Sequence, residues 1–240
     1  EAEKLITKKT KAIMVVHLYG QVADLDAFKE ISKKYRVLLI EDCAEAIGSE
    51  FRGKPVGTFG DASTFSFFGN KTISTGEGGM VLFKQKKLAK KARILRDHGM
   101  QPEKKYWHEL VGFNYRLTNI QAAIGFAQLE RFHKIIEKKI TIFKWYQSFL
   151  TGIRGIEQLP FELEVSKHSN WLFTILLADY IDKTFVMKSL LKRGIETREV
   201  FYPLNEMPPY KNFKCSKNIS NSQMISRQGI SLPSSVNLNI

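Results

Sequence analysis

The amino-terminal part of the chain alternates short apolar runs with a segment of helical periodicity. The runs at 12–17 (AIMVVH) and 37–40 (VLLI) are rich in β-branched and aliphatic residues and predict buried strands. Between them, 24–35 carries apolar residues at the spacing of one helix face. Two parallel strands need a crossover connection, so this strand–helix–strand unit predicts an α/β fold with a mostly parallel sheet.

Further strands and helices follow the first unit. The pattern predicts strands at 63–68 and 80–83, a helix at 86–97, and a helical segment that starts at Thr118 and runs, with a break near Phe132, to about Leu150. Thr118 and Gln121 match a capping box, in which a threonine and a glutamine three residues later satisfy the first backbone N–H groups of a helix.

The sequence pattern changes in the carboxyl-terminal part, where the predicted elements are shorter and a loop contains several prolines. It predicts a strand at 171–177, a helix at 182–193, a short strand at 195–198 and a helix at 221–227. We therefore expect two domains, a larger α/β domain over 1–140 and a smaller α+β domain over 141–240.

The charge suggests polyanionic partners but does not identify one. The 240 residues include 37 Lys and Arg against 24 Asp and Glu, a net charge of +13. The lysines lie between apolar residues of predicted helices, which is typical of a solvated helix face. No helix-turn-helix, zinc-ligand spacing or apolar span of membrane length accompanies them. We therefore expect no metal site, no nucleic-acid partner and no membrane association.

Two residues have positions at which a ligand-binding or catalytic side chain is expected. Asp42 follows a buried strand, where ligands bind in open α/β sheets, although capping the next helix is an equally good interpretation. Lys71 lies after another predicted strand, between aromatic residues and glycines. A desolvated amine there would be a nucleophile for a carbonyl group, whereas the alternative is a surface lysine in a loop.

Several segments together resemble a known family. They are 41–46 (EDCAEA), 64–71 (TFSFFGNK), 75–79 (TGEGG) and 112–116 (GFNYR). In order and spacing they resemble the DegT/DnrJ/EryC1/StrS aminotransferases, pyridoxal-phosphate (PLP) enzymes that aminate keto sugars attached to nucleotides. The resemblance covers nearly the whole chain. It implies the PLP-dependent transferase fold type I, with the carboxyl-terminal part of the cofactor-binding domain in the first predicted domain and an incomplete small domain after it.

The resemblance also implies roles for individual residues. Lys71 would bond the cofactor aldehyde and later carry the proton, and Asp42 would pair with the pyridine nitrogen. Ser66 would donate to the cofactor phosphate. Asn114 would reach the phosphate of the neighbouring subunit's cofactor, which implies a homodimer. Glu45 would stand beside the ring oxygen, at a position where most of the family has glutamine.

Substrate-side residues follow from the same resemblance. The stretches 65–80 and 106–120 are most similar to family members that aminate C4 of GDP-4-keto-6-deoxymannose, with glutamate as donor, for surface polysaccharides. Arg198 and Tyr202 would contact this nucleotide sugar, since an arginine suits a diphosphate. His17 would be a substrate contact or a structural hydrogen-bonding residue. The two cysteines of the chain fit a reducing, cytoplasmic setting.

Three alternatives remain at this stage. They are an aminotransferase for another nucleotide keto sugar, a non-catalytic relative, and a basic nucleic-acid binder. Retention of both Lys71 and Asp42 argues against the second. Compared with the family, we expect the chain to be truncated at both ends and to lack the turn that cradles the cofactor phosphate. We therefore expect this chain alone to bind PLP weakly or not at all.

Overall fold

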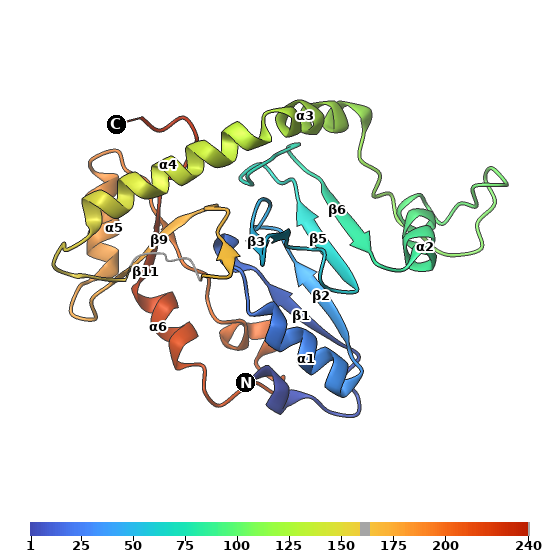
Figure 1. Ribbon diagram of the computed structural model, residues 1–240, viewed down its shortest axis with the longest axis horizontal. Coiled ribbons are helices and arrows are strands. Elements are labelled where there is room, and N and C mark those ends of the chain that lie inside the picture. Colours follow the sequence, from blue (N-terminus) through green and yellow to red (C-terminus); the bar gives the residue numbers. More distant parts are fainter. Residues whose placement is uncertain (159–163, 240) are drawn as a thin grey trace. The chain divides into compact units, whose positions relative to one another are not determined.

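The computed structural model describes residues 1–158 and 164–239 (Figure 1). In chain order its α-helices and strands are β1 (Ala12–Val16), α1 (Leu25–Tyr35), β2 (Leu38–Asp42), β3 (Glu50–Phe51), β4 (Lys54–Pro55), β5 (Ala62–Ser66), β6 (Gly79–Phe83), α2 (Lys86–Arg96), α3 (Asn119–Glu130), α4 (Phe132–Leu150), β7 (Ile156–Gln158), β8 (Ser166–Lys167), β9 (Phe173–Leu177), α5 (Lys183–Leu191), β10 (Arg198–Glu199), α6 (Ser220–Gln228) and β11 (Gly229–Leu232). Short 3₁₀ helices lie at Ala2–Leu5, Leu18–Gly20, Leu204–Glu206 and Pro208–Tyr210.

The chain forms two compact units. One, here called the sheet unit, comprises Lys11–Lys134 with Val165–His168. The other, here called the second unit, comprises Glu1–Thr10, Ile135–Glu164 and Ser169–Ile240. The two domains expected from the sequence, 1–140 and 141–240, stay a prediction.

The main sheet of the sheet unit is mostly parallel, in the order β1-β2-β5-β6. The β1–β2 and β2–β5 pairs are parallel, which confirms the predicted crossover unit. The last strand, β6, runs antiparallel to β5, because residues 67–78 return the chain to the same edge instead of crossing the sheet through a helix. The sheet therefore carries an antiparallel edge strand on a parallel core, as many large α/β sheets do.

Helix α1 covers one face of β1 and β2 (Figure 1). The Asp24 side chain caps it by accepting from the Ala27 N–H at 3.1 Å, and Arg36 ends it in the left-handed conformation. Leu25 is fully buried against Val15 and Leu39, the inward-facing residues of the two strands. Burial of such aliphatic side chains contributes about 1.5–3 kcal/mol each relative to exposure.

The opposite face of this sheet is open. On this face lie side chains that point away from the buried Val15 and Leu39. They are partly exposed, at 59% for Met14, 45% for Val16 and 47% for Leu38. Parallel sheets are normally covered on both faces. The register places Asp42 beside Val16, so the carboxylate lies on this open face at the carboxyl end of the strands.

The second unit contains an antiparallel sheet in the order β10-β11-β9-β7. The sequence pattern predicted β9 but not β11. Strand β11 lies between β10 and β9 in this sheet, and all four of its residues are buried. The short strand expected at 195–198 lies instead at Arg198–Glu199. Gly194 adopts φ +78° and Ile195 donates its N–H to Leu190 O, so Ile195 closes the end of α5 and is not free to pair in a strand.

The two central helices form as predicted. Thr118 and Gln121 make the complete capping box of α3, and the helical run breaks at Arg131, next to the expected position. Gly152 and Gly155 follow α4 with positive φ, where glycine avoids the steric cost of a side chain. Among the described residues, no helix combines the length and apolar character that a membrane crossing requires.

Candidate active site

Several of the residues singled out from the sequence lie at one edge of the main sheet. Asp42 ends β2 and Ser66 ends β5, and these parallel strands finish at the same edge. Lys71 lies in the loop that follows β5 and reaches Glu45, three residues after Asp42. This is the edge at which open α/β sheets bind ligands.

Asp42 presents one engaged and one open carboxylate oxygen. Oδ1 accepts from the Ala44 N–H at 3.0 Å and from the Thr64 hydroxyl at 3.4 Å. Among residues 1–158 and 164–239, Oδ2 has no hydrogen-bond partner. The backbone N–H and the hydroxyl fix the orientation of the carboxylate, and the second oxygen is available to a ligand.

The Lys71 side chain is held by Glu45. The Lys71 Nζ lies 3.3 Å from Glu45 Oε1, and only 13% of the lysine side chain is exposed. The other carboxylate oxygen, Oε2, accepts from the Tyr19 N–H at 2.8 Å. The desolvation that the sequence indicated for Lys71 is therefore present, and the surface-loop alternative does not hold.

Ser66 and Asn114 occupy different parts of the sheet unit. The Ser66 hydroxyl oxygen accepts from the Phe68 N–H at 3.3 Å, which leaves its proton free to be donated. Asn114 is exposed in the loop between α2 and α3, where it pairs with Asp97 in an isolated β-bridge. An exposed asparagine on such a loop is accessible to another subunit.

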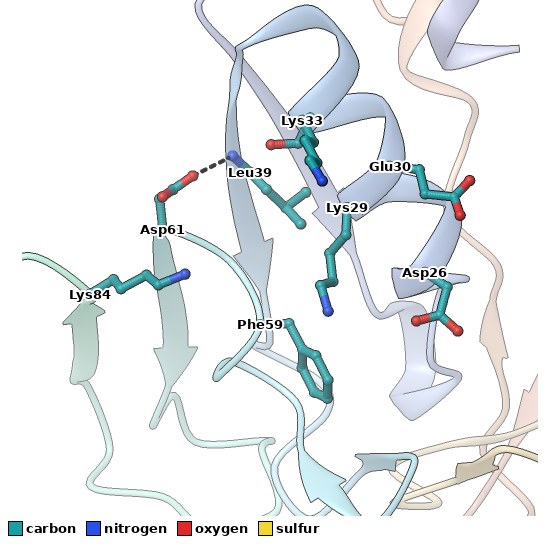
Figure 2. A pocket seen from close by; sticks show the side chains of 9 residues that line it. Asp26, Lys29, Glu30, Lys33, Leu39, Phe59, Asp61 and Lys84 are labelled. Carbon is teal, nitrogen blue, oxygen red and sulfur yellow. Dashed lines mark hydrogen bonds between the residues drawn. The ribbon is translucent and has the colours of Figure 1, made fainter.

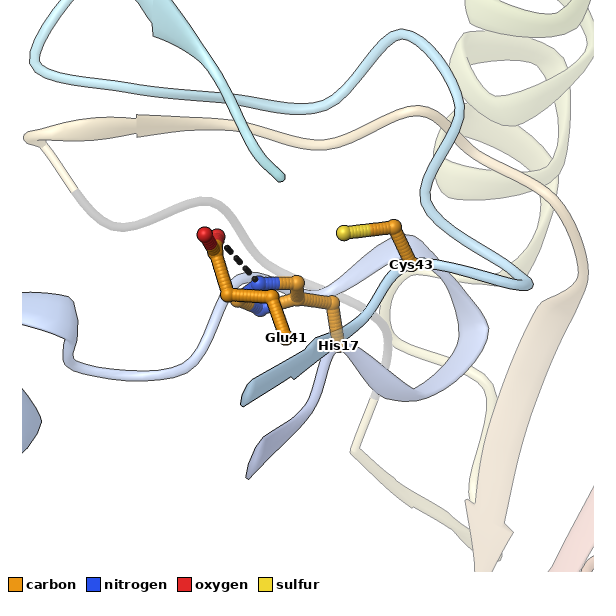
Figure 3. Close-up of side chains that lie close together, drawn as sticks. All are labelled: His17, Glu41 and Cys43. Atoms are coloured by element: carbon orange, nitrogen blue, oxygen red, sulfur yellow. Dashed lines mark hydrogen bonds and ion pairs between the residues drawn. The ribbon is translucent and has the colours of Figure 1, made fainter. Parts of the chain in front are cut away.

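His17 and Glu41 form a fully buried pair beside Asp42 (Figure 3). The His17 Nδ1 accepts from the Ala23 N–H, so the ring proton lies on Nε2, which faces Glu41 Oε2 at 3.3 Å. Three backbone N–H groups also donate to the Glu41 carboxylate at 2.6–2.8 Å. They belong to Gly57, Phe59 and Gly60.

The hydrogen bonds set the protonation state of Glu41. Burial by itself would raise the pKa of Glu41, but the hydrogen bonds from His17 and from the loop that contains Gly60 outweigh it and hold the pKa below its usual value of 4.5. The charged carboxylate therefore ties the end of β1 and the loop before β5 to β2. The sequence was compatible with a structural role for His17 but did not point to Glu41, although an acidic pair at a strand end is an available signal.

Cys43 completes a compact group with these two residues (Figure 3). The ligand atoms of His17, Glu41 and Cys43 lie within 4.8 Å of one another. Both ring nitrogens and both carboxylate oxygens already have hydrogen-bond partners, and burial, with the charges of Glu41 and Asp42, raises the pKa of the Cys43 thiol. These donors are occupied, so we assign the group a structural role.

The two substrate-side candidates belong to the second unit. Arg198 lies on β10 and is exposed. The Tyr202 hydroxyl donates to Glu199 Oε2 at 3.3 Å, which places this tyrosine against the same short strand. Both side chains are accessible to a ligand.

A hollow of about 540 Å³ lies at the opposite, amino edge of the main sheet (Figure 2). It is lined on α1 by Asp26, Lys29, Glu30 and Lys33, and across the hollow by Asp61 and Lys84. Asp61 Oδ2 is engaged by the Leu39 N–H at 3.0 Å. The mixed charges indicate a solvated surface, and the hollow is remote from the edge that carries Asp42.

The chain is similar to proteins of one known family. The sequence profile of the DegT/DnrJ/EryC1/StrS aminotransferase family matches residues 1–240. The chain is 44% identical to GDP-perosamine synthase of Caulobacter vibrioides over 238 residues, which cover 98% of the chain. The match spans 64% of the length of that curated relative.

Solved structures share the fold. Helicobacter pylori PseC, an aminotransferase involved in the biosynthesis of pseudoaminic acid, superposes with a TM-score of 0.93 at 30% identity, covering 99% of this chain and 65% of that one. The putative sugar aminotransferase Spr1654 from Streptococcus pneumoniae, solved in its PLP form, superposes with a TM-score of 0.91 at 27% identity. The superposition covers 99% of this chain and 67% of that one. The expected fold type I architecture is confirmed.

Proposed function

The chain belongs to the DegT/DnrJ/EryC1/StrS aminotransferase family, and from that membership we propose that the protein transfers an amino group to a nucleotide-linked keto sugar with PLP as cofactor. The observation that carries the proposal is the placement of a largely buried amine, Lys71, at the strand edge that also presents Asp42. An amine that can bond an aldehyde and a carboxylate that can hold a pyridine proton are the two groups that this cofactor needs from the protein.

The residues present fit the cofactor. PLP supplies an electron sink for the carbon that gains or loses the amino group. Asp42 would use its open Oδ2 to hold a proton at the ring nitrogen, and the Ser66 hydroxyl would donate to the phosphate. Lys71 would move the proton between the substrate carbon and the cofactor, and Glu45 would place a negative charge beside the ring oxygen.

We propose GDP-4-keto-6-deoxymannose as the substrate, glutamate as the amino donor and GDP-perosamine for surface polysaccharide (O-antigen) as the product. The similarity to GDP-perosamine synthases supports this choice. Arg198 would bind the diphosphate, with Tyr202 and His17 as the other substrate-side candidates. His17 has both ring nitrogens engaged inside the protein, so Arg198 and Tyr202 have the more accessible positions.

A homodimer is part of the proposal. Asn114 of the partner subunit would reach the cofactor phosphate. Support comes from the exposed apolar side chains on the same loop, among them Val111 at 94% and Tyr115 at 73% exposure. Large apolar side chains exposed together on one loop are typical of an interaction site. Sedimentation of the protein at increasing concentration should give a dimer, and V111D should shift it toward the monomer.

We further propose that the protein works in the cytoplasm. Both cysteines, Cys43 and Cys215, are free thiols, which suits a reducing compartment.

The test is borohydride reduction of the protein, expressed from its complete gene, in the presence of PLP, followed by peptide mapping. We expect the label on Lys71, and K71A should abolish both labelling and amino transfer. K167A, which alters a more exposed lysine of the same unit, is the matched control and should keep both. Label on a different lysine would refute the assignment.

A substrate panel tests the sugar. GDP-, UDP- and dTDP-linked 4-keto-6-deoxy sugars should be compared by kcat/KM. A preference for a UDP- or dTDP-linked sugar would place the protein elsewhere in the family, and no turnover of any sugar by the PLP-labelled protein would favour a non-catalytic role.

A further inference from the structure

Glu45 contacts two segments at once, the Lys71 amine and the backbone of the turn that follows β1. We propose that Glu45 is a positioning residue that ties the Lys71 amine to the turn at Tyr19. The functional meaning rests on the proposed role of Lys71, but the contact itself requires no cofactor.

The contact is built from both oxygens of one carboxylate. Oε1 lies 3.3 Å from Lys71 Nζ, and Oε2 accepts from the Tyr19 N–H at 2.8 Å. Glu45 is 8% exposed, so solvent screens the ion pair less than it screens a surface pair. The amine is thus held at the carboxyl edge of the sheet, near the strand end that carries Asp42.

The turn at Tyr19 depends on this acceptor. Tyr19 has φ +56° and ψ +12°, a left-handed conformation that is uncommon for a residue with a side chain. Such a conformation persists where surrounding contacts hold it. Glu45 holds its N–H, and the Ser49 hydroxyl donates to the neighbouring Gly20 carbonyl at 2.7 Å.

The two functions of the carboxylate are chemically separable. The Tyr19 N–H needs only an acceptor, which a glutamine oxygen also provides. The Lys71 ammonium needs a negative charge or an acceptor on its own side, where glutamine would present its NH₂ group. Glutamine at position 45 should therefore keep the turn and release the amine, whereas alanine should lose both.

Trace acylation of the 240-residue chain with acetic anhydride, without PLP, measures access to the amine. Peptide mass spectrometry gives the rate at Lys71 relative to that of wild type. We expect E45Q to raise this rate roughly fivefold, because an amine engaged with a carboxylate is held away from the reagent. Hydrogen exchange at the Tyr19 amide should remain unchanged in E45Q and should accelerate roughly tenfold in E45A.

E50Q is the matched control, because Glu50 Oε1 also lies 3.3 Å from a lysine, Lys167, but in a more exposed pair. It should change neither the Lys71 rate nor Tyr19 exchange. An unchanged Lys71 rate in E45Q, with the fold intact by circular dichroism, would overturn the proposal even if E45A fails to fold. Failure of PLP to label Lys71 would instead refute the proposed function and leave this contact standing.

Discussion

The imidazole of His17 donates through Nε2 to Glu41 Oε2 across 3.3 Å, at a point where neither side chain is exposed to solvent. With the three backbone N–H groups, the carboxylate accepts four hydrogen bonds, two on each oxygen. All of its acceptor positions are therefore filled from within the protein.

Replacing Glu41 by glutamine should destabilise the sheet unit strongly. The amide NH₂ of E41Q would face groups that also donate, so at least one buried N–H would lose its acceptor. We expect a loss of roughly 2–5 kcal/mol in the free energy of unfolding. Urea denaturation followed by circular dichroism measures it. E30Q, on the exposed surface of α1, is the control and should lie within about 0.5 kcal/mol of wild type.

The Glu41 carboxylate should make the free energy of unfolding depend on pH in the acid range. The pKa of Glu41 is lower in the folded chain than its ordinary value of 4.5, so the unfolded chain binds the proton more readily. Its stabilising contribution is therefore complete above pH 4.5 and declines as the pH falls below that value toward the folded pKa. Unfolding free energies measured from pH 6 down to pH 3 should fall less steeply in E41Q than in wild type.

Lys139 should make the free energy of unfolding depend on pH in a second, alkaline range. It is buried in the second unit, where its Nζ donates to the carbonyls of Trp171 and Ser234, both at 3.1 Å. Burial lowers the pKa of Lys139 from 10.5 to about 8. Between these values the unfolded chain binds more protons, so the contribution of Lys139 to stability rises with pH, by about 1.4 kcal/mol per pH unit.

This window can be tested by comparing wild type with K139M at pH 8 and pH 10. The difference in unfolding free energy should move in favour of wild type at the higher pH. K144M, which changes an exposed lysine of the same helix, should show no such trend. A pH-independent difference for K139M would contradict the assignment.

The two cysteines should differ in reactivity. Cys43 is fully buried and its thiol pKa is raised by burial and by the charges of Glu41 and Asp42, whereas Cys215 is exposed. Because the thiolate is the reactive form, iodoacetamide at pH 8 should modify Cys215 in the native chain and spare Cys43. Intact-mass analysis should show one adduct in buffer and two in urea.

Arg198 should affect substrate binding more than folding. Its side chain is exposed on β10, so R198A should change the free energy of unfolding by less than about 0.5 kcal/mol. If Arg198 binds the diphosphate, KM for the nucleotide sugar should rise roughly tenfold or more, while KM for glutamate stays constant. R193A, an exposed arginine after α5, is the control and should leave both constants unchanged.

The sequence alone determined the parts of this protein that depend on neighbouring residues. The apolar runs and their spacing were enough to identify β1, α1 and β2 as a parallel crossover unit, which the register confirms. The Thr118–Gln121 pair was enough to place the start of α3, because a capping box is made within one turn of chain. The motif around Lys71 and Asp42 indicated the family, which the profile match confirms.

Features whose partners come from distant segments are seen only in the folded chain. The burial of β11 depends on β9 and β10, and the contact between Glu45 and Lys71 depends on the loop that follows β5. In the sequence Glu41 is one more acidic residue, yet in the folded chain its buried carboxylate accepts hydrogen bonds from a histidine on one distant segment and from backbone N–H groups of a single loop, residues 57–60. Periodicity records which face a residue takes, whereas hydrogen-bond partners are fixed only when the chain folds and brings those segments together.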